Sequence, residues 1–288
     1  YNRTYNFQGN LGQVEKDYKT GYINRRGKVI TPIKYDELFA FNEGMSLVVL
    51  NERYGYIDRT GKVVIKPKYD NAYNFNNGLA IVTIDGKSGF INKRGKVLVP
   101  IRYDEVNLFE NGLAKVMIDD KWGYINNRGK TRVPLKYDEI RSFNEGYAQI
   151  MLDNKWGFVN KQGELICELK YDEAAEFDDN GEFAAVMIAE KWGFINAKGE
   201  EIVPLQYDEV SEFCNEMAAV CKDELWGFVN AKGEEVFSPQ FDDVESFQEK
   251  GMTLGFIGEE PFILFENGEK APLSQFAEFV NDITTKKQ

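Results

Sequence analysis

Hydrophobic and polar positions alternate in short runs along most of the chain, and turn-forming residues separate the runs. Residues 113–118 place Ala114, Val116 and Ile118 on one face. This period of two predicts β-strands. Asn-Gly at 111–112 and Asp-Gly-Lys at 85–87 predict tight hairpin turns. The pattern therefore indicates an all-β protein.

Residues 103–136 contain one complete set of these runs. We expect four strands, at about 103–109, 113–118, 122–126 and 130–133. Gly129 suits the turn between the third and fourth strands, which needs a left-handed residue. Proline cannot donate a ladder hydrogen bond, so we expect the fourth strand to stop at Pro134.

The same set recurs along the chain. Tyr-Asp pairs, with Phe241-Asp242 as a variant, recur at intervals of 34 residues, except for one interval of 36. The two extra residues lengthen a loop tip within 177–183. Self-similarity at a fixed period predicts a tandem repeat protein. We expect an array over residues 1–273, with repeats that begin near residues 1, 35, 69, 103, 137, 171, 207 and 241.

A second motif places a glycine before an aromatic residue in seven repeats. The residue before that glycine is Thr20, Tyr54 or Ser88 in the first three repeats, and tryptophan afterwards. A glycine kept inside a strand predicts a bulge or a close approach of another backbone. The aromatic residues could form a row of ligand sites, but their regular recurrence favours packing between stacked repeats. The Trp-Gly pairs are Trp122-Gly123, Trp156-Gly157, Trp192-Gly193 and Trp226-Gly227.

Helical periodicity is found only at the end of the chain. Residues 274–288 begin with a serine cap and place Phe276, Phe279 and Val280 on one face. We expect a short C-terminal helix that caps the last repeat, because a stacked array needs its open face covered.

The combination Lys-Trp-Gly-Phe-Ile-Asn, then Gly, Val-Pro and Tyr-Asp-Glu, resembles the WG-repeat (KWG-repeat) family of bacterial proteins. The resemblance covers residues 1 to about 273. It implies an all-β repeat array and supplies no catalytic residues. The chain departs from the motif at Thr20, Tyr54 and Ser88, and in its eighth repeat, where 259–270 lacks the glycine that precedes the aromatic residue in the other repeats.

Eight antiparallel repeats could stack as an open superhelix or close into a β-propeller. Propeller blades usually have about 40 to 50 residues, so a repeat of 34 is short. A degenerate last repeat and a helical cap also favour the open, solenoid-like array. Closure remains an alternative, because the first two and last two strands could combine into one unit.

Composition excludes several kinds of site. The chain has no histidine, so triads and metal sites that need imidazole are excluded. Cys167, Cys214 and Cys221 lack the spacing of a disulfide framework or zinc site, and we expect buried thiols. No repeat offers the clustered oxygen ligands of a calcium loop, so we expect no metal and no cofactor. No apolar run approaches the roughly 18 residues of a membrane span, so we expect no membrane insertion.

Charge is the feature that varies most along the array. Residues 1–144 contain 24 Lys and Arg against 16 Asp and Glu, and residues 145–288 contain 11 against 31. The net charges are thus +8 and −20. Such asymmetry bears on partners rather than on fold.

The turns between the third and fourth strands carry much of this contrast. We call these turns the tips. In a stacked array the tips line one edge, which is basic in the first half and mixed in the second, where Glu164, Glu200, Glu201, Glu234 and Glu235 occur. The basic tip residues are Arg25, Arg26, Lys28, Arg59, Lys62, Lys93, Arg94, Lys96, Arg128 and Lys130.

These observations favour a non-catalytic interaction scaffold whose partner is another protein, with weak head-to-tail self-association as a further expectation. Binding of an anionic polymer or a carbohydrate is the alternative, although the acidic half disfavours nucleic acid. The simplest explanation is that the charged tips only keep a sheet edge soluble.

An enzyme is disfavoured, because nearly every carboxylate lies at a position that recurs in each repeat. Glu176, Asp178 and Asp179 form the least repetitive cluster. The sequence does not distinguish a location in the bacterial cytoplasm from one in the cell envelope or outside the cell.

Overall fold

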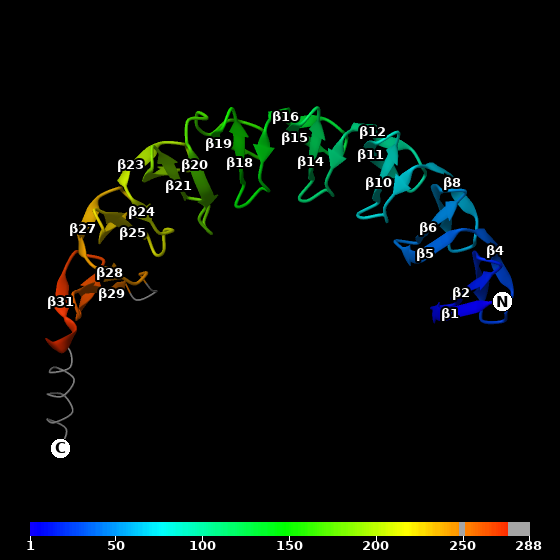
Figure 1. Ribbon diagram of the computed structural model, residues 1–288, viewed down its shortest axis with the longest axis horizontal. Coiled ribbons are helices and arrows are strands. Elements are labelled where there is room, and N and C mark those ends of the chain that lie inside the picture. Colours follow the sequence, from blue (N-terminus) through cyan, green and yellow to red (C-terminus); the bar gives the residue numbers. More distant parts are fainter. Residues whose placement is uncertain (248–250, 276–288) are drawn as a thin grey trace, which may run out of the picture. The chain divides into compact units, whose positions relative to one another are not determined.

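The computed structural model describes residues 1–247 and 251–275. Within them, the strands form eight sheets, each built from strands that are consecutive in the chain and antiparallel (Figure 1). The chain divides into two compact units, Tyr1–Tyr137 and Asp138–Gln288, which we call the N-terminal and C-terminal units.

Four sheets make up the N-terminal unit, in the orders β1-β2-β3-β4, β5-β6-β7-β8, β9-β10-β11-β12 and β13-β14-β15-β16. Their strands are β1 (Arg3–Gln8), β2 (Leu11–Lys16), β3 (Lys19–Asn24), β4 (Val29–Tyr35), β5 (Glu37–Asn42), β6 (Met45–Leu50), β7 (Arg53–Asp58), β8 (Val63–Tyr69), β9 (Asn71–Ala72), β10 (Leu79–Ile84), β11 (Lys87–Asn92), β12 (Val97–Tyr103), β13 (Glu105–Val106), β14 (Leu113–Ile118), β15 (Lys121–Asn126) and β16 (Thr131–Tyr137).

The C-terminal unit contains the sheets β17-β18-β19, β20-β21-β22-β23, β24-β25-β26-β27 and β28-β29-β30-β31. Their strands are β17 (Glu139–Ile140), β18 (Tyr147–Leu152), β19 (Lys155–Asn160), β20 (Glu173–Phe177), β21 (Phe183–Ile188), β22 (Lys191–Asn196), β23 (Glu201–Tyr207), β24 (Glu209–Val210), β25 (Met217–Lys222), β26 (Leu225–Asn230), β27 (Glu235–Phe241), β28 (Asp243–Val244), β29 (Met252–Ile257), β30 (Glu260–Phe265) and β31 (Lys270–Pro272).

The hairpin between the second and third strands has the geometry that its turn residues predict. Strands β14 and β15 pair without interruption up to Ile118 and Lys121. Asp119 and Asp120 connect them with φ of 49° and 57°. Two positive φ values make the two-residue turn whose twist matches that of the strands it joins.

The first and fourth strands differ from the expectation. Strand β13 has only two residues, and β16 continues through Pro134 to Tyr137. The expected stop at Pro134 is therefore wrong. Because β16 is the last strand of its sheet, it has one free edge, where a missing N–H costs no ladder bond.

The proline-containing segment of β16 bulges over the repeated glycine of β15. Register shifts between the pairs Trp122–Tyr137 and Tyr124–Val133, because β16 has extra residues there. A Cβ atom on Gly123 would lie 2.6 Å from the Val133 carbonyl oxygen. Gly55 and Gly89 are crowded in the same way. The predicted close approach of backbone to glycine is confirmed.

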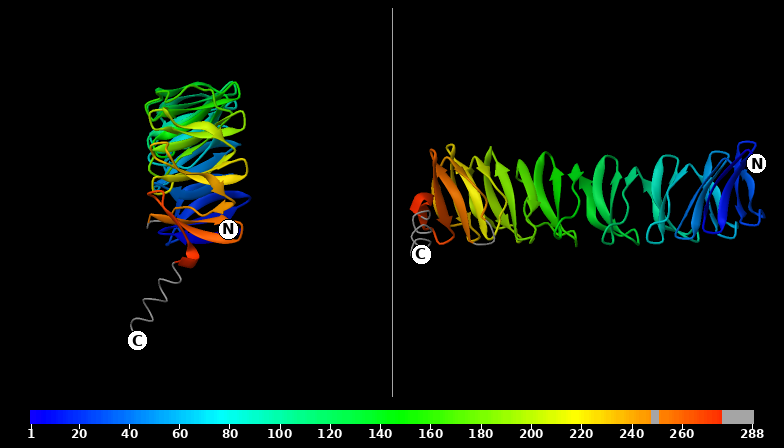
Figure 2. Two further views of the ribbon diagram at one scale, coloured as in Figure 1. Left: turned by 90° about the vertical axis from the view of Figure 1, so that its left-hand side faces the viewer. Right: turned by 90° about the horizontal axis from the view of Figure 1, so that it is seen from below.

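Aromatic side chains pack consecutive sheets against each other. Phe90 of β11 is buried, and its ring centroid lies 4.6 Å from that of Phe109, which belongs to the next repeat. Phe194 packs in the same way against Phe213, at 4.8 Å. The core of each unit therefore lies between its sheets, which succeed one another in chain order (Figure 2).

In the part of the chain that the structure describes, no strand pairing joins one sheet to the next, and no sheet closes into a barrel. The predicted all-β array of antiparallel repeats is thus confirmed, as an open row of sheets within each unit.

Two places in the C-terminal unit break the pattern. Strands β17, β18 and β19 have no regular fourth strand beside them. Leu169 replaces the repeated proline there, and isolated bridges such as Trp156–Tyr171 keep the segment in place. At the end of the described chain, residues 273–275 are helical, and the rest of the predicted helix, 276–288, lies outside the described residues.

Candidate functional site: the charged edges of the repeats

The tips are built on one repeated hydrogen-bond pattern. The Asn92 side-chain oxygen accepts the backbone N–H groups of Arg94 and Lys96, both at 3.0 Å, and Gly95 has φ of +76°. Asp58 takes the place of asparagine in the second repeat. Because Asn and Gly hold the turn, the side chains between and after them can vary without changing its backbone. The other asparagines in this role are Asn24, Asn126, Asn160, Asn196 and Asn230.

Successive tips in the N-terminal unit lie against the preceding repeat. The Cβ position of Gly129 is 3.5 Å from the Leu98 carbonyl oxygen, and that of Gly95 is 3.2 Å from the Ile65 side chain. Each tip therefore covers the fourth strand of the repeat before it. This contact brings the tips of the unit onto one edge, as the sequence predicted.

The basic tip residues of the N-terminal unit differ in what they contact. Lys93 is engaged, because its Nζ lies 3.0 Å from Glu43 Oε2 and donates to the Glu43 carbonyl oxygen at 2.8 Å. The contact of the Lys93 ammonium with the Glu43 carboxylate lowers the pKa of that carboxyl. Arg25 donates to the Gly9 carbonyl oxygen at 3.2 Å. Within the described ranges, no acidic side chain pairs with the exposed cations Arg26, Lys28, Arg94, Lys96, Arg128 and Lys130.

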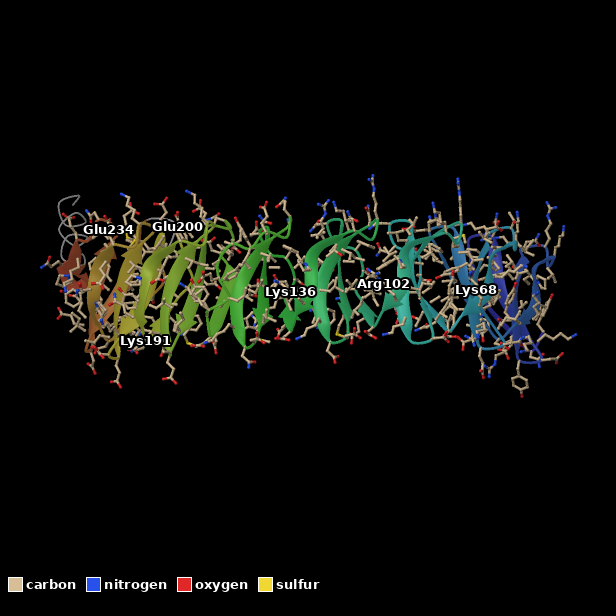
Figure 3. The ribbon with its side chains drawn as sticks, turned by 90° about the horizontal axis from the view of Figure 1, so that it is seen from above. Lys68, Arg102, Lys136, Lys191, Glu200 and Glu234 are labelled. Atoms are coloured by element: carbon tan, nitrogen blue, oxygen red, sulfur yellow. The ribbon has the colours of Figure 1, made fainter. Side chains whose placement is uncertain are left out.

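A second row of cations lies along the fourth strands and was missed at the sequence level. Lys68, Arg102 and Lys136 are exposed along these strands of the N-terminal unit (Figure 3). Each covers the ring of the tyrosine that follows it, at 5.0 Å, 5.2 Å and 5.2 Å from the centroid. The residue before each Tyr-Asp pair could have revealed this row in the sequence. That position is basic in every repeat up to Lys170, and Gln206 occupies it in the next repeat.

The aspartate of each Tyr-Asp pair is already used by the fold. Asp208 pairs with Lys191 of the preceding sheet and accepts the Asp223 backbone N–H at 2.9 Å. The Lys191 ammonium holds the pKa of the Asp208 carboxyl below its usual value. Lys87 and Asp104 form the same pair in the N-terminal unit. These carboxylates therefore connect consecutive sheets.

In the C-terminal unit, glutamate follows the glycine of each tip where lysine follows it in the N-terminal unit. Glu200 and Glu234 lie at one edge of this unit, and Lys191 lies at the opposite edge (Figure 3). The carboxylates of both glutamates accept a hydrogen bond from the asparagine of their own tip, at 2.7 Å and 2.8 Å. The tips thus carry charges of both signs in this unit and mainly basic side chains in the N-terminal unit.

The contacts of the tryptophans favour packing. Trp156 is only 8% exposed and lies in the core with Tyr171 and Ala174. Trp122 lies beneath the Lys115 ammonium, which is 4.1 Å from the ring centroid.

Two of the least repetitive carboxylates accept separate hydrogen bonds. Glu176 accepts a hydrogen bond from the Asn144 amide at 3.0 Å, and Asp178 accepts the Glu182 backbone N–H at 2.8 Å. Both bonds support the longer loop tip.

Among the described residues, no group of three or more Cys, Asp or Glu side chains is placed to hold a metal ion. The thiols differ from the expectation, because Cys214 is exposed, whereas Cys221 is buried and Cys167 is partly buried. In the same ranges, no helix has the length and apolar character needed to cross a bilayer.

Fold and site together define a tandem β-repeat protein whose framework is repeated and whose exposed charges vary. The model of the family described as WG containing repeat matches residues 21–54, 54–87, 89–122, 122–156, 156–192, 192–226 and 226–254. The chain belongs to this family. No curated protein sequence matches it.

Solved structures resemble the chain only distantly. A eukaryotic initiation factor aligns with 11% identity and a TM-score of 0.39, over 93% of this chain and 86% of that one. Hsv2p of Kluyveromyces lactis aligns with 10% identity and a TM-score of 0.30, over 78% of this chain and 91% of that one. Neither likeness is close enough to carry a functional argument.

Proposed function

We propose that the chain is a non-catalytic interaction module whose N-terminal unit binds an acidic segment of a partner protein. The observation that carries the proposal is the pair of cation rows on this unit. The tip row and the fourth-strand row are both exposed, while aspartates such as Asp104 are already paired within the fold. Exposed cations without acidic partners attract an acidic segment and speed its encounter.

A partner of limited length fits this arrangement better than a long polyanion does. The chain as a whole has a net charge of −12, and its C-terminal unit carries acidic tips. The tips of that unit keep Lys161, Lys198 and Lys232 but add glutamates, so a long polyanion would meet like charge there.

The acidic tips of a second copy are one such partner, which would give weak head-to-tail self-association. The contact would be weak, because Glu200 and Glu234 each already accept a hydrogen bond within their own tip.

A labelled acidic peptide tests the proposal. We expect binding that weakens as salt rises, because exposed charges are screened at distances near 10 Å at 0.1 M salt. The double substitution Arg94→Glu and Lys96→Glu should weaken binding by roughly tenfold or more. Lys198→Glu and Lys232→Glu are the matched control, because they introduce equal charge changes at tips of the C-terminal unit.

Equal binding by both double variants would overturn the proposal, as would binding that salt does not affect. A heparin-like polymer and a single-stranded oligonucleotide should be titrated in parallel. If both bind more tightly than the acidic peptide, the N-terminal unit is a general polyanion binder. Sedimentation of the chain alone at low and high salt measures self-association.

A further inference from the structure

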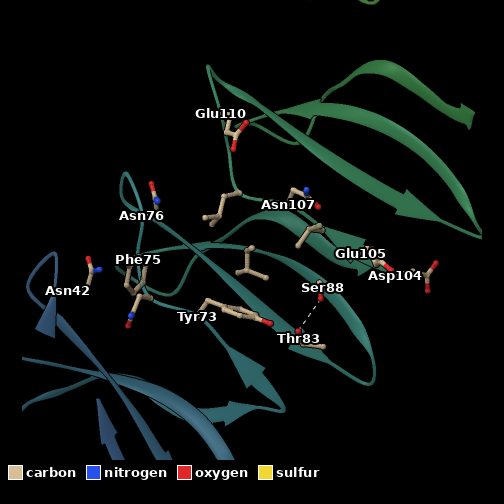
Figure 4. Close-up of a pocket in the computed structure, with 14 residues that line it drawn as sticks. Asn42, Tyr73, Phe75, Asn76, Thr83, Ser88, Asp104, Glu105, Asn107 and Glu110 are labelled. Carbon is tan, nitrogen blue, oxygen red and sulfur yellow. Dashed lines mark hydrogen bonds between the residues drawn. The ribbon is translucent and has the colours of Figure 1, made fainter. Parts of the chain in front are cut away.

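A groove lies between the third and fourth sheets of the N-terminal unit. Its volume is about 740 Å³, within the range of small-molecule sites. One wall comes from β9–β12 and includes Tyr73 and Ser88, and the other comes from the start of the fourth repeat, at 104–110 (Figure 4). Ile81 and Phe75 contribute buried apolar surface to the lining.

The groove exists because this repeat lacks a large side-chain pair that later repeats contain. In β14 and β15 the pair is Met117 and Trp122, which face each other across the strands. Thr83 and Ser88 occupy the same positions here, and their hydroxyl oxygens are 3.0 Å apart. Elsewhere the tryptophan fills the space between sheets, as buried Trp156 does. Two hydroxyls thus replace two large apolar groups and leave the space open.

Two large, exposed side chains border the same groove. Tyr73 is 53% exposed and Leu108 is 45% exposed. Leu108 departs from the preceding repeat, which has Asn74 at its position, whereas Tyr73 keeps the aromatic character that the preceding repeat has in Phe39. Large apolar side chains that stay exposed at a groove are a feature of binding sites.

The polar groups of the groove include both donors and acceptors. Glu105 offers carboxylate oxygens, Asn107 offers an amide, and the Thr83–Ser88 pair offers two hydroxyls. In the described part of the chain, the side chains of Glu105 and Asn107 have no hydrogen-bond partner. The lining residues include carboxylates and no Lys or Arg, which disfavours an anionic ligand.

We infer that this groove binds a neutral saccharide. A sugar ring has an apolar face of C–H groups and a rim of hydroxyls that both donate and accept hydrogen bonds. The Tyr73 ring, which extends toward the Thr83–Ser88 pair, suits the apolar face (Figure 4). Glu105, Asn107 and the two hydroxyls suit the rim. This site is separate from the cation rows and does not depend on them.

Saccharide titrations test the inference. The probes are maltose, cellobiose, N-acetylglucosamine and chitobiose, with soluble amylose and a soluble cellulose derivative to distinguish free sugars from polymer chains. Binding is followed by saturation-transfer NMR and calorimetry. We expect saturable binding of at least one probe, unchanged by high salt, because the contacts are between neutral groups and a neutral ligand.

Three variants locate the binding. Ser88→Trp with Thr83→Met rebuilds the pair of the later repeats, fills the groove and should abolish binding while the fold is kept. Tyr73→Ala should weaken binding roughly tenfold. Tyr18→Ala is the control, because Tyr18 is 90% exposed in a turn outside the groove and should leave binding unchanged.

Two results would overturn the inference. One is the absence of saturable binding to every probe. The other is undiminished binding by both groove variants. Neither result bears on the acidic-peptide titration, so the two proposals can fail separately.

Discussion

Gly123→Ala should destabilise the chain although the substitution is small. The Cβ of alanine would lie 2.6 Å from the Val133 carbonyl oxygen and 2.9 Å from both the Leu135 nitrogen and the Pro134 carbonyl carbon. Ordinary contacts begin at 3.4 Å, so the backbone of β16 must retreat by about 0.8 Å. Such overpacking typically costs about 1 to 3 kcal/mol. Gly123 has no positive φ, so alanine recovers about 0.5 to 1 kcal/mol of chain entropy. We expect a net loss of about 1 to 2 kcal/mol.

Gly157→Ala is the matched control, because the same Lys-Trp-Gly motif surrounds it. No regular fourth strand covers this glycine, and the nearest atoms to a Cβ are Leu169 Cγ at 3.2 Å and the Cys167 and Glu168 carbonyl oxygens at 3.3 Å. These atoms need to move by only about 0.2 Å to reach the ordinary contact distance of 3.4 Å. The entropy gain should therefore offset most of the contact, and we expect a change within about 0.5 kcal/mol of zero.

Urea unfolding, followed by tryptophan fluorescence and circular dichroism, measures both variants. Repeat arrays can unfold in more than one step. Amide hydrogen exchange of β15 and β19 therefore supplies the local comparison. If the two substitutions cost the same, or Gly157→Ala costs more, the explanation of the repeated glycine by the proline-containing bulge is wrong.

Three further outcomes follow from the framework. Asn92→Ala removes the acceptor of two backbone N–H groups at its tip and should lower the free energy of unfolding by about 1 to 2 kcal/mol in urea melts, whereas Asn92→Asp keeps the acceptor, as Asp58 does in its own tip, and should change it little. Phe194→Ala removes a buried ring packed on Phe213 and should cost about 3 to 5 kcal/mol in the same assay. Lys191→Met should raise the pKa of the Asp208 carboxyl toward its usual value in an NMR titration. Since the folded pKa is the lower one, the pair stabilises the chain above the unfolded pKa, and this stabilisation is lost as pH falls through the folded pKa. If the pKa of Asp208 in the variant equals that in the unmutated chain, the inferred effect of the Lys191–Asp208 pair is wrong.

Much of the fold could be predicted because its rules are local. Strand β14 has the predicted bounds, 113–118, and the hairpin turn at Asp119 has the expected left-handed residues. Alternation and turn chemistry act over a few residues, and their recurrence revealed the repeats. The tip edge also followed from the period alone.

Other features needed contacts between distant residues. The path of β16 through Pro134 depends on its place at the edge of the sheet, which no residue near the proline reveals. The fourth-strand cations were visible as letters, but only the folded strands place them in one row.

Ser88 illustrates what the sequence determined and what only the tertiary structure decided. The sequence by itself determined that this repeat lacks tryptophan, and it determined the period, the turns and the charge asymmetry. Only the tertiary structure decided that the missing ring leaves an open groove, because the opposite wall comes from residues 104–110 of the next repeat. A strand or turn depends on neighbours along the chain, whereas a cavity depends on which side chains meet across two sheets.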